Sequence, residues 1–223
     1  MSAAAQQQLA MKLSSRGGKR RGAGRKPKGP SAGMPHRPRP VLKGRFPVHV
    51  TLRVHEHVWG LRSRRSRRSF RRIAAAFKGI HGRRGFRLAE YAILGNHLHL
   101  VVEASDQRCL ARGLQALEIR VAKGLNQMMG RRGAVFADRY HAHILRTPSE
   151  VANALRYVRG NFAVHAARRG ETVPALADAY SSQVLVDGAL PREQDGPEGP
   201  LVSPPGTWLL SSGWRRARAR RSG

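Results

Sequence analysis

The spacing of apolar residues along this chain changes repeatedly between a strand-like and a helix-like period. Short runs rich in β-branched and other apolar residues predict strands at residues 48–54, 86–94, 97–103 and 139–146. Apolar residues that recur three and four positions apart predict helices at residues 66–81, 110–129 and 148–169. The order β-α-β-β-α-β, followed by a further helix, is that of a ferredoxin-like α+β fold with an antiparallel sheet.

Turn and cap signals separate these elements. Gly95-Asn96 joins the second and third predicted strands as a tight hairpin. Thr147, Pro148 and Glu150 form a helix start, with Thr147 as the N-cap and Glu150 three positions later. The pattern therefore predicts a compact domain at residues 46–170, whose last helix begins near position 148.

The flanking segments have a different composition. Residues 1–45 are rich in Gly, Pro, Lys and Arg and contain no acidic residue, which predicts a disordered basic arm. Residues 171–223 are rich in Pro and Gly and predict an irregular tail with a basic C-terminus. The end of this tail, which contains Trp208 and Trp214, is either a docking or base-stacking segment or a short helix that lies on the domain.

The charge of the chain points to its partner. The chain has 42 Lys and Arg against 13 Asp and Glu, a formal net charge of +29, and a pI near 11.9. A field of this sign attracts polyanions, so nucleic acid is the expected partner rather than a membrane. The candidate DNA-binding residues are Arg25 and Lys26 in the arm, Arg64, Arg65, Arg67, Arg68 and Arg71 around the first helix, and Arg139 in the fourth strand.

Cysteine content and the first residues bear on the compartment. The single Cys109 excludes an internal disulfide framework and a Cys-rich zinc site. The Ala- and Gln-rich beginning of the chain lacks the apolar stretch of a signal peptide. We expect a cytoplasmic, nucleoid-associated protein that acts as a monomer or a homodimer.

Two histidines stand out within the third predicted strand. Because side chains on a strand alternate between faces, His97 and His99 point the same way. Leu98, Leu100 and Val102 point to the other face, where a core would lie. Two imidazoles side by side can hold one metal ion. The alternative is a pair of surface histidines on an apolar strand.

The helix at residues 148–169 carries a second polar pair. Tyr157 and Asn161 are four residues apart and therefore lie on one face of the helix, beside its apolar stripe. The phenol is a candidate nucleophile, and the amide oxygen is a candidate metal ligand. If this helix packs against the sheet near His97 and His99, these polar groups converge on one metal.

These motifs together resemble those of a known family. His-Leu-His at 97–99 resembles the histidine–hydrophobic–histidine motif of HUH nucleases. Tyr-Val-Arg-Gly-Asn at 157–161 resembles the tyrosine helix of single-tyrosine transposases, and residues 22–29 and 136–141 share this likeness. Over residues 46–170 the chain looks most similar to the REP-associated tyrosine transposases, which are relatives of the transposases of the smallest insertion sequences.

The resemblance implies an activity and a site. It implies a single-strand endonuclease and strand transferase that acts in DNA transposition and recombination on hairpin-forming DNA. His97, His99 and Asn161 would bind Mg²⁺ or Mn²⁺, which would polarise the scissile phosphate. Tyr157 would attack the phosphorus, form a 5′-phosphotyrosine and release a 3′-OH that can later rejoin strands. Because imidazole suits Zn²⁺, Ni²⁺ or Mn²⁺ better than Mg²⁺, the sequence does not fix the ion.

Several alternatives are open at this level. Tyr140 is a rival nucleophile beside a second His-x-His pair, His141 and His143. Glu103 shares the face of the first histidine pair, either as a further ligand or as a surface residue, and His49 reads as a flanking or DNA-contacting residue. The alternative functions are a non-enzymatic nucleic-acid-binding protein with the same fold, and a HUH nuclease similar to relaxases or replication initiators.

Overall fold

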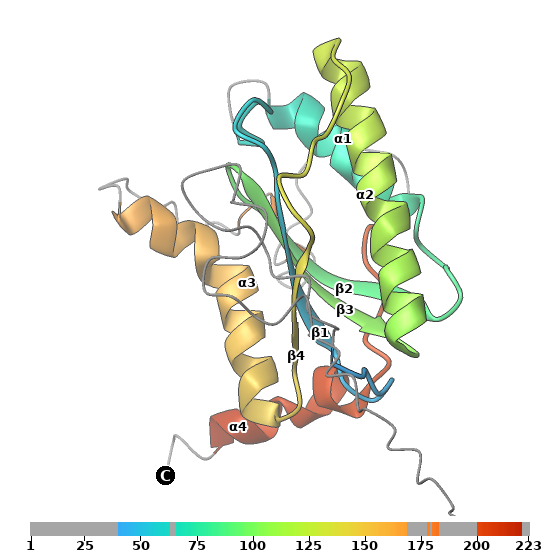
Figure 1. The fold of residues 1–223 in the computed structure, drawn as a ribbon. Helices are drawn as coiled ribbons and strands as arrows, with labels where there is room; N and C mark the ends of the chain where they lie inside the picture. The colour runs from blue at the N-terminus through green and yellow to red at the C-terminus, as the bar shows by residue number, and fades with distance from the viewer. Residues whose placement is uncertain (1–39, 63–65, 169–177, 179, 183–199, 220–223) are drawn as a thin grey trace, which may run out of the picture. The chain divides into compact units, whose positions relative to one another are not determined.

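The computed structural model describes residues 40–62, 66–168, 178, 180–182 and 200–219 (Figure 1). In this part of the chain the elements are β1 (Val48–Arg53), α1 (Ser66–Lys78), β2 (Phe86–Ile93), β3 (His97–Ala104), α2 (Gln107–Met129), β4 (His141–Ile144) and α3 (Pro148–Arg168). A π-helical turn, η2 (Leu209–Gly213), and a short helix, α4 (Arg215–Ala219), follow. The order of strands and helices is the order that the hydrophobic pattern predicts.

The four strands form one antiparallel sheet in the order β2-β3-β1-β4. With α1 and α2 in the connections, this topology is the ferredoxin-like α+β fold expected from the sequence. The central strands are β3 and β1, and their register places Thr51 opposite His99 and Arg53 opposite His97. The predicted histidine pair therefore lies on a central strand, towards its hairpin end.

The two faces of the sheet are covered by different helices (Figure 1). On the first face, α1 and α2 pack over a larger apolar core that contains Leu98, Leu100 and Val102, as the alternation along β3 predicts. On the second face, α3 packs against β2 and β3 over a smaller core that contains Val101 and Leu155. The apolar stripe of α3 thus positions this helix on the histidine face.

The start of α3 has the predicted capping box. The N–H of Glu150 donates to Thr147 Oγ1 (3.2 Å), and the N–H of Thr147 donates to the Glu150 carboxylate (3.0 Å). These reciprocal bonds satisfy donors that the first helical turn leaves without intrahelical partners. The helix that carries Tyr157 therefore begins at a fixed point.

Two elements are shorter than predicted by more than one residue. The first helix ends at Lys78 instead of position 81, because Gly79 follows and Gly82 and Gly85 turn the chain with φ near 72°. The fourth strand spans His141–Ile144 instead of residues 139–146, because its ladder with β1 covers these four residues.

Segments that follow α3 in the sequence return to the sheet. The N–H of Ile93 donates to the carbonyl of Tyr180 (2.9 Å), so this short segment lies along the edge of β2. Leu209 and Leu210 of η2 are buried in the smaller core. The end of the expected irregular tail therefore contains short helices packed on the domain, because its apolar residues add to the core beneath α3. The predicted arm up to residue 39 and most of residues 171–199 lie outside the described part of the chain.

Candidate active site

His97 and His99 lie together on the second face of the sheet. Their ring centroids are 4.7 Å apart, and the rings are nearly perpendicular. His99 is 3% exposed, whereas His97 is half-buried at the hairpin end of β3. The Nδ1 of His97 lies 2.6 Å from the Oδ1 of Asn96, and this hydrogen bond orients its ring. One imidazole of the pair is thus enclosed, and the other reaches the surface.

Two residues of β1 contact His99 from the neighbouring strand. The Nδ1 of His99 lies 3.2 Å from the Nε2 of His49 and 3.2 Å from the Oγ1 of Thr51. The rings of His49 and His99 are stacked, with their centroids 5.2 Å apart. The sequence alone suggests that His49 is a flanking or DNA-contacting residue, but the β1–β3 register brings it against His99.

His49 also connects the site with the second His-x-His pair. The β1–β4 register places His143 opposite His49 and His141 opposite Thr51, so both pairs lie on the same face. Burial lowers the pKa of His49 to about 4, and the nearby His143 and His141 contribute to this shift. His49 is therefore neutral at neutral pH and adds no positive charge beside His99.

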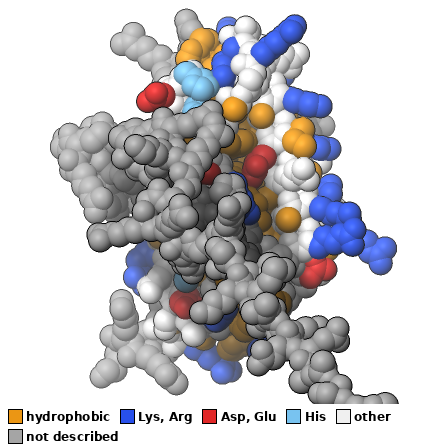
Figure 2. Space-filling view, in the orientation of Figure 1, with side chains coloured by type: hydrophobic (Ala, Val, Ile, Leu, Met, Phe, Trp, Pro, Cys, Tyr) orange, Lys and Arg blue, Asp and Glu red, His pale blue; other side chains and the backbone are white. Residues whose placement is uncertain are grey.

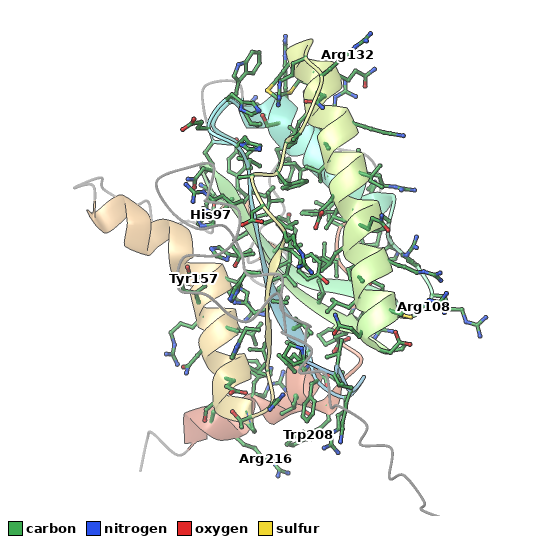
Figure 3. All side chains as sticks on the ribbon, in the orientation of Figure 1. His97, Arg108, Arg132, Tyr157, Trp208 and Arg216 are labelled. Atoms are coloured by element: carbon green, nitrogen blue, oxygen red, sulfur yellow. The ribbon has the colours of Figure 1, made fainter. Side chains whose placement is uncertain are left out.

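The α3 helix brings Tyr157 over this histidine cluster (Figure 3). The ring centroid of Tyr157 lies 4.9 Å from that of His99 and 5.7 Å from that of His49, and the ring is edge-on to both. Tyr157 is 47% exposed, whereas the next residue, Val158, is buried in the smaller core. Tyr157 thus lies at the border of the buried stripe, where a large substrate can reach its phenol.

The remaining polar candidates are placed differently. Tyr140 packs against the larger core, whereas Tyr157 lies over the histidines. Asn161 follows Tyr157 by about one turn of α3, and its side chain is outside the described set. Among the side chains that are described, no three His, Cys, Asp or Glu residues are grouped closely enough to hold a metal. Asn161 stays the third ligand that the sequence predicts beside His97 and His99.

An ion pair holds the other side of α3. Arg159 pairs with the carboxylate of Glu90 on β2, and the hydroxyl of Ser182 donates to the same carboxylate. Glu90 is buried, and a buried carboxylate is costly unless it is paired and hydrogen-bonded. Neither member of this pair is predicted from the sequence as a site residue. The only signal is a lone acidic residue inside the apolar run at residues 86–94.

The predicted DNA-binding residues that are described lie on α1 or just before β4. Arg67, Arg68 and Arg71 are exposed on α1, which packs on the opposite face of the sheet. Arg139 is exposed two positions before β4 begins. The structure does not describe Arg25, Lys26, Arg64 and Arg65.

A further row of cationic side chains runs along α2. Figure 2 shows Lys and Arg side chains along this side of the domain. The exposed members in and just after α2 are Arg108, Arg112, Arg120, Lys123 and Arg132. In Figure 3, Arg108 and Arg132 point away from His97 and Tyr157.

No helix in the described ranges has both the length and the apolar character needed to cross a membrane.

Glu103 contacts the C-terminal segment instead of the histidines. Its carboxylate accepts hydrogen bonds from the N–H groups of Gly206 and Thr207, at 2.7 Å each, and pairs with Arg87 at 3.2 Å. A cavity of about 750 Å³ lies beside it and is lined partly by Arg83 and Arg84. This cavity is at the end of β3 opposite to the histidine pair.

Comparison with known proteins supports the fold. A scan against protein-family models and a search of curated proteins found no match. Among solved structures, the chain is similar to a REP-associated tyrosine transposase bound to a REP hairpin, with a TM-score of 0.53 and 14% sequence identity. The likeness covers 76% of this chain and 98% of that chain. At this level of identity the likeness shows the fold, which is similar to that of this REP-associated tyrosine transposase.

Proposed function

We propose that the chain is a single-tyrosine HUH transposase, a metal-dependent enzyme that cleaves and rejoins single-stranded DNA through Tyr157. The proposal depends above all on the position of Tyr157, whose ring lies 4.9 Å from that of His99 on the face shared with His97. The fold thus brings a partly exposed phenol next to paired imidazoles that lie far from it in sequence. The likeness to a tyrosine transposase fold is consistent with this use of the site.

The two histidines, with Asn161, would hold Mg²⁺ or Mn²⁺, and the ion would supply polarisation of the scissile phosphate. The donor set fits such an ion. The Nδ1 of His97 contacts Asn96 and the Nδ1 of His99 contacts residues of β1, which makes Nε2 of each ring the candidate ligand atom. Imidazole ligands suit Zn²⁺, Ni²⁺ or Mn²⁺ better than Mg²⁺, so the identity of the ion is part of what the assay below must establish.

Tyr157 would supply both the nucleophile and the covalent carrier. Its phenolic oxygen forms a bond to phosphorus as the bond from phosphorus to the 3′ oxygen breaks. The phenol loses its proton, the 3′ oxygen gains one, and the products are a 5′-phosphotyrosine and a 3′-OH. Because one phosphodiester replaces another, a 3′-OH can reverse the step and rejoin strands, which hydrolysis by water would not allow.

The proposed substrate is a single DNA strand that folds into a hairpin. The net charge of +29 and the exposed cations of α1 and α2 favour a polyanion. The structural neighbour is bound to a REP hairpin, and we extend this type of ligand to the present chain as part of the proposal. The exposed half of Tyr157 leaves its phenol accessible to such a strand.

The test is the formation of a covalent protein–DNA adduct. The full chain is incubated with Mn²⁺ or Mg²⁺ and a pool of single-stranded hairpins that have random flanks and a 3′ label. We expect a labelled adduct that withstands denaturation, because the 5′-phosphotyrosine retains the labelled 3′ fragment. Tyr157→Phe is expected to abolish the adduct while hairpin binding persists, and Tyr140→Phe serves as the matched control.

Two results would contradict the proposal. An adduct that persists in Tyr157→Phe and disappears in Tyr140→Phe would identify Tyr140 as the nucleophile. Hairpin binding without an adduct for the wild-type chain, with either ion, would favour a non-enzymatic nucleic-acid-binding protein. Salt dependence of binding does not separate these cases, because it is steep for any basic protein that binds nucleic acid.

A further inference from the structure

The tyrosine helix is attached to the sheet on both sides of its buried stripe. Val158 is 1% exposed and belongs to the smaller core between α3 and the sheet. Successive helical residues are about 100° apart around the axis, so Tyr157 and Arg159 flank Val158 on opposite sides. Tyr157 reaches the histidines of β3 and β1, and Arg159 reaches Glu90 of β2.

The register of the sheet places these two attachments in line. Glu90 of β2 lies opposite Val101 of β3, which in turn lies opposite His49 of β1. Glu90 and His49 are therefore two strand spacings apart, about 10 Å, with Val101 of the smaller core between them. The helix lies across this row, with Arg159 at the Glu90 end and Tyr157 at the His49 end.

The Glu90–Arg159 pair resists rotation of the helix about its own axis. The apolar contacts of Val158 and its neighbours hold α3 against the sheet, but apolar contact is not directional. A charge-assisted hydrogen bond to a buried carboxylate is directional, and turning the helix would leave that carboxylate buried without its cation. A rotation of only 10° would displace the helix surface by about 1 Å, since its radius with side chains is about 5–6 Å.

We infer that the Glu90–Arg159 ion pair sets the rotation of α3 and so holds Tyr157 over His99 and His49. Arg159 is then a positioning residue for Tyr157, and Ser182, which donates to the same carboxylate, holds Glu90 in place. The catalytic consequence of this inference depends on the proposed function, but the positional claim does not. The two are therefore tested by separate readouts.

The positional readout is the nuclear magnetic resonance signal of the His99 ring. The Tyr157 ring is close enough to shift this signal, and Tyr157→Ala gives its position when that ring is absent. We expect Arg159→Ala to move the His99 signal towards the Tyr157→Ala position. Arg156→Ala is the matched control, because Arg156 is an exposed arginine of the same helix whose guanidinium contacts Asn153 of α3. It should leave the signal unchanged.

The catalytic readout is the single-turnover rate of adduct formation on the hairpin pool, measured together with hairpin affinity. We expect Arg159→Ala to slow adduct formation by about 100-fold, the loss that a misplacement of about 1 Å can cause. Hairpin affinity is expected to stay near that of the wild type, because Arg159 acts through Tyr157. An ion pair that only stabilised the fold would lower the melting temperature without moving the His99 signal or this rate.

The outcomes separate the inference from the proposed function. A folded Arg159→Ala variant with a wild-type His99 signal would overturn the inference, even if the chain proves to be a transposase. A moved His99 signal in a chain that forms no adduct would support the inference and contradict the proposed function. If Arg159→Ala does not fold, the double variant Glu90→Gln/Arg159→Gln replaces it, since neutral amides avoid an unpaired buried charge. A wild-type His99 signal in that variant would likewise overturn the inference.

Discussion

The two faces of the sheet are formed by the same strands but differ in the side chains that they carry. The first face is apolar throughout its centre and is closed by α1 and α2 over the larger core. The second face carries histidines and buried carboxylates, and α3 lies mainly over β2 and β3. Because alternate residues of β3 serve the two faces, a single strand contributes Leu98 and Leu100 to stability and His97 and His99 to the site. Stability and chemistry can therefore be changed separately by substitutions one position apart.

The polar groups of the second face are held by specific partners. Glu90 is paired with Arg159, Glu103 binds the N–H groups of Gly206 and Thr207, and His99 contacts His49. Each contact ties the sheet to another element or joins two of its strands. The first face is held mainly by packing, whereas the second face adds to its smaller core directional bonds that also orient the candidate site.

The largest effect on stability is expected at the first face, which α1 and α2 cover. Leu114→Ala removes a side chain of α2 that is fully buried, and it should lower the free energy of unfolding by about 4 kcal/mol. Adduct formation per folded molecule should be unchanged, because Leu114 lies on the face opposite to Tyr157. Chemical denaturation combined with the adduct assay measures both quantities. A loss of adduct in the folded variant would show that the faces are coupled.

The next largest effect is a pH dependence of stability that arises from His49 on the second face. The pKa of His49 is about 4 in the folded chain, against an ordinary value of 6.5, so the unfolded chain takes up the proton first as the pH falls. The contribution of His49 to the free energy of unfolding is fully present above pH 6.5. It is lost as the pH falls towards 4, and the loss is up to about 3 kcal/mol. The free energy of unfolding, measured in buffer with a chelator, should therefore fall more steeply with decreasing pH for the wild type than for His49→Asn. The same pH dependence in both proteins would contradict this expectation.

A smaller effect is expected where Glu103 holds the C-terminal segment. Glu103→Ala removes the acceptor of two N–H groups and should lower the free energy of unfolding by about 2 kcal/mol. Amide hydrogen exchange should increase at Gly206 and Thr207, while exchange in β1 changes little. Unaltered exchange at these two amides would mean that the segment is held mainly by the burial of Leu209 and Leu210.

The smallest effect is expected at the start of α3. Thr147→Ala removes the side-chain acceptor of the capping box and should cost about 1 kcal/mol. Ser149→Ala, an exposed change in the same turn, is the control and should be nearly neutral. The adduct rate should change little, because the Glu90–Arg159 pair holds the helix near Tyr157. A large loss of rate would instead assign the positioning of Tyr157 to the helix start.

The sequence predicts those features that depend on short spacing. The period of apolar residues locates the strands and helices, and the Thr147–Glu150 spacing locates the start of α3. Alternation along one strand is enough to place His97 and His99 on a common face. Each of these features requires only a few neighbouring residues, and the structure confirms the elements and the capping box.

The contacts that the sequence does not predict depend on the register between strands. In the sequence His49 is one of several histidines in and near the first strand, and only the β1–β3 ladder identifies it as the partner of His99. In the sequence Glu90 is a lone charge in an apolar strand, and only the packing of α3 shows that Arg159 lies beside it. The length of α1 also differs, because Gly79 ends a helix that the apolar period alone would extend.

The central pairing of β1 with β3 has a consequence for the folding of the chain. The His49–His99 contact joins residues 50 positions apart, and Tyr157 is contributed by a still later segment. Contacts between distant segments form only after the entropic cost of closing the intervening loops has been met. The histidine cluster therefore cannot assemble in a chain that has formed only its local helices and hairpin. A partly synthesised or partly unfolded chain carries the separate residues of the site but not their arrangement.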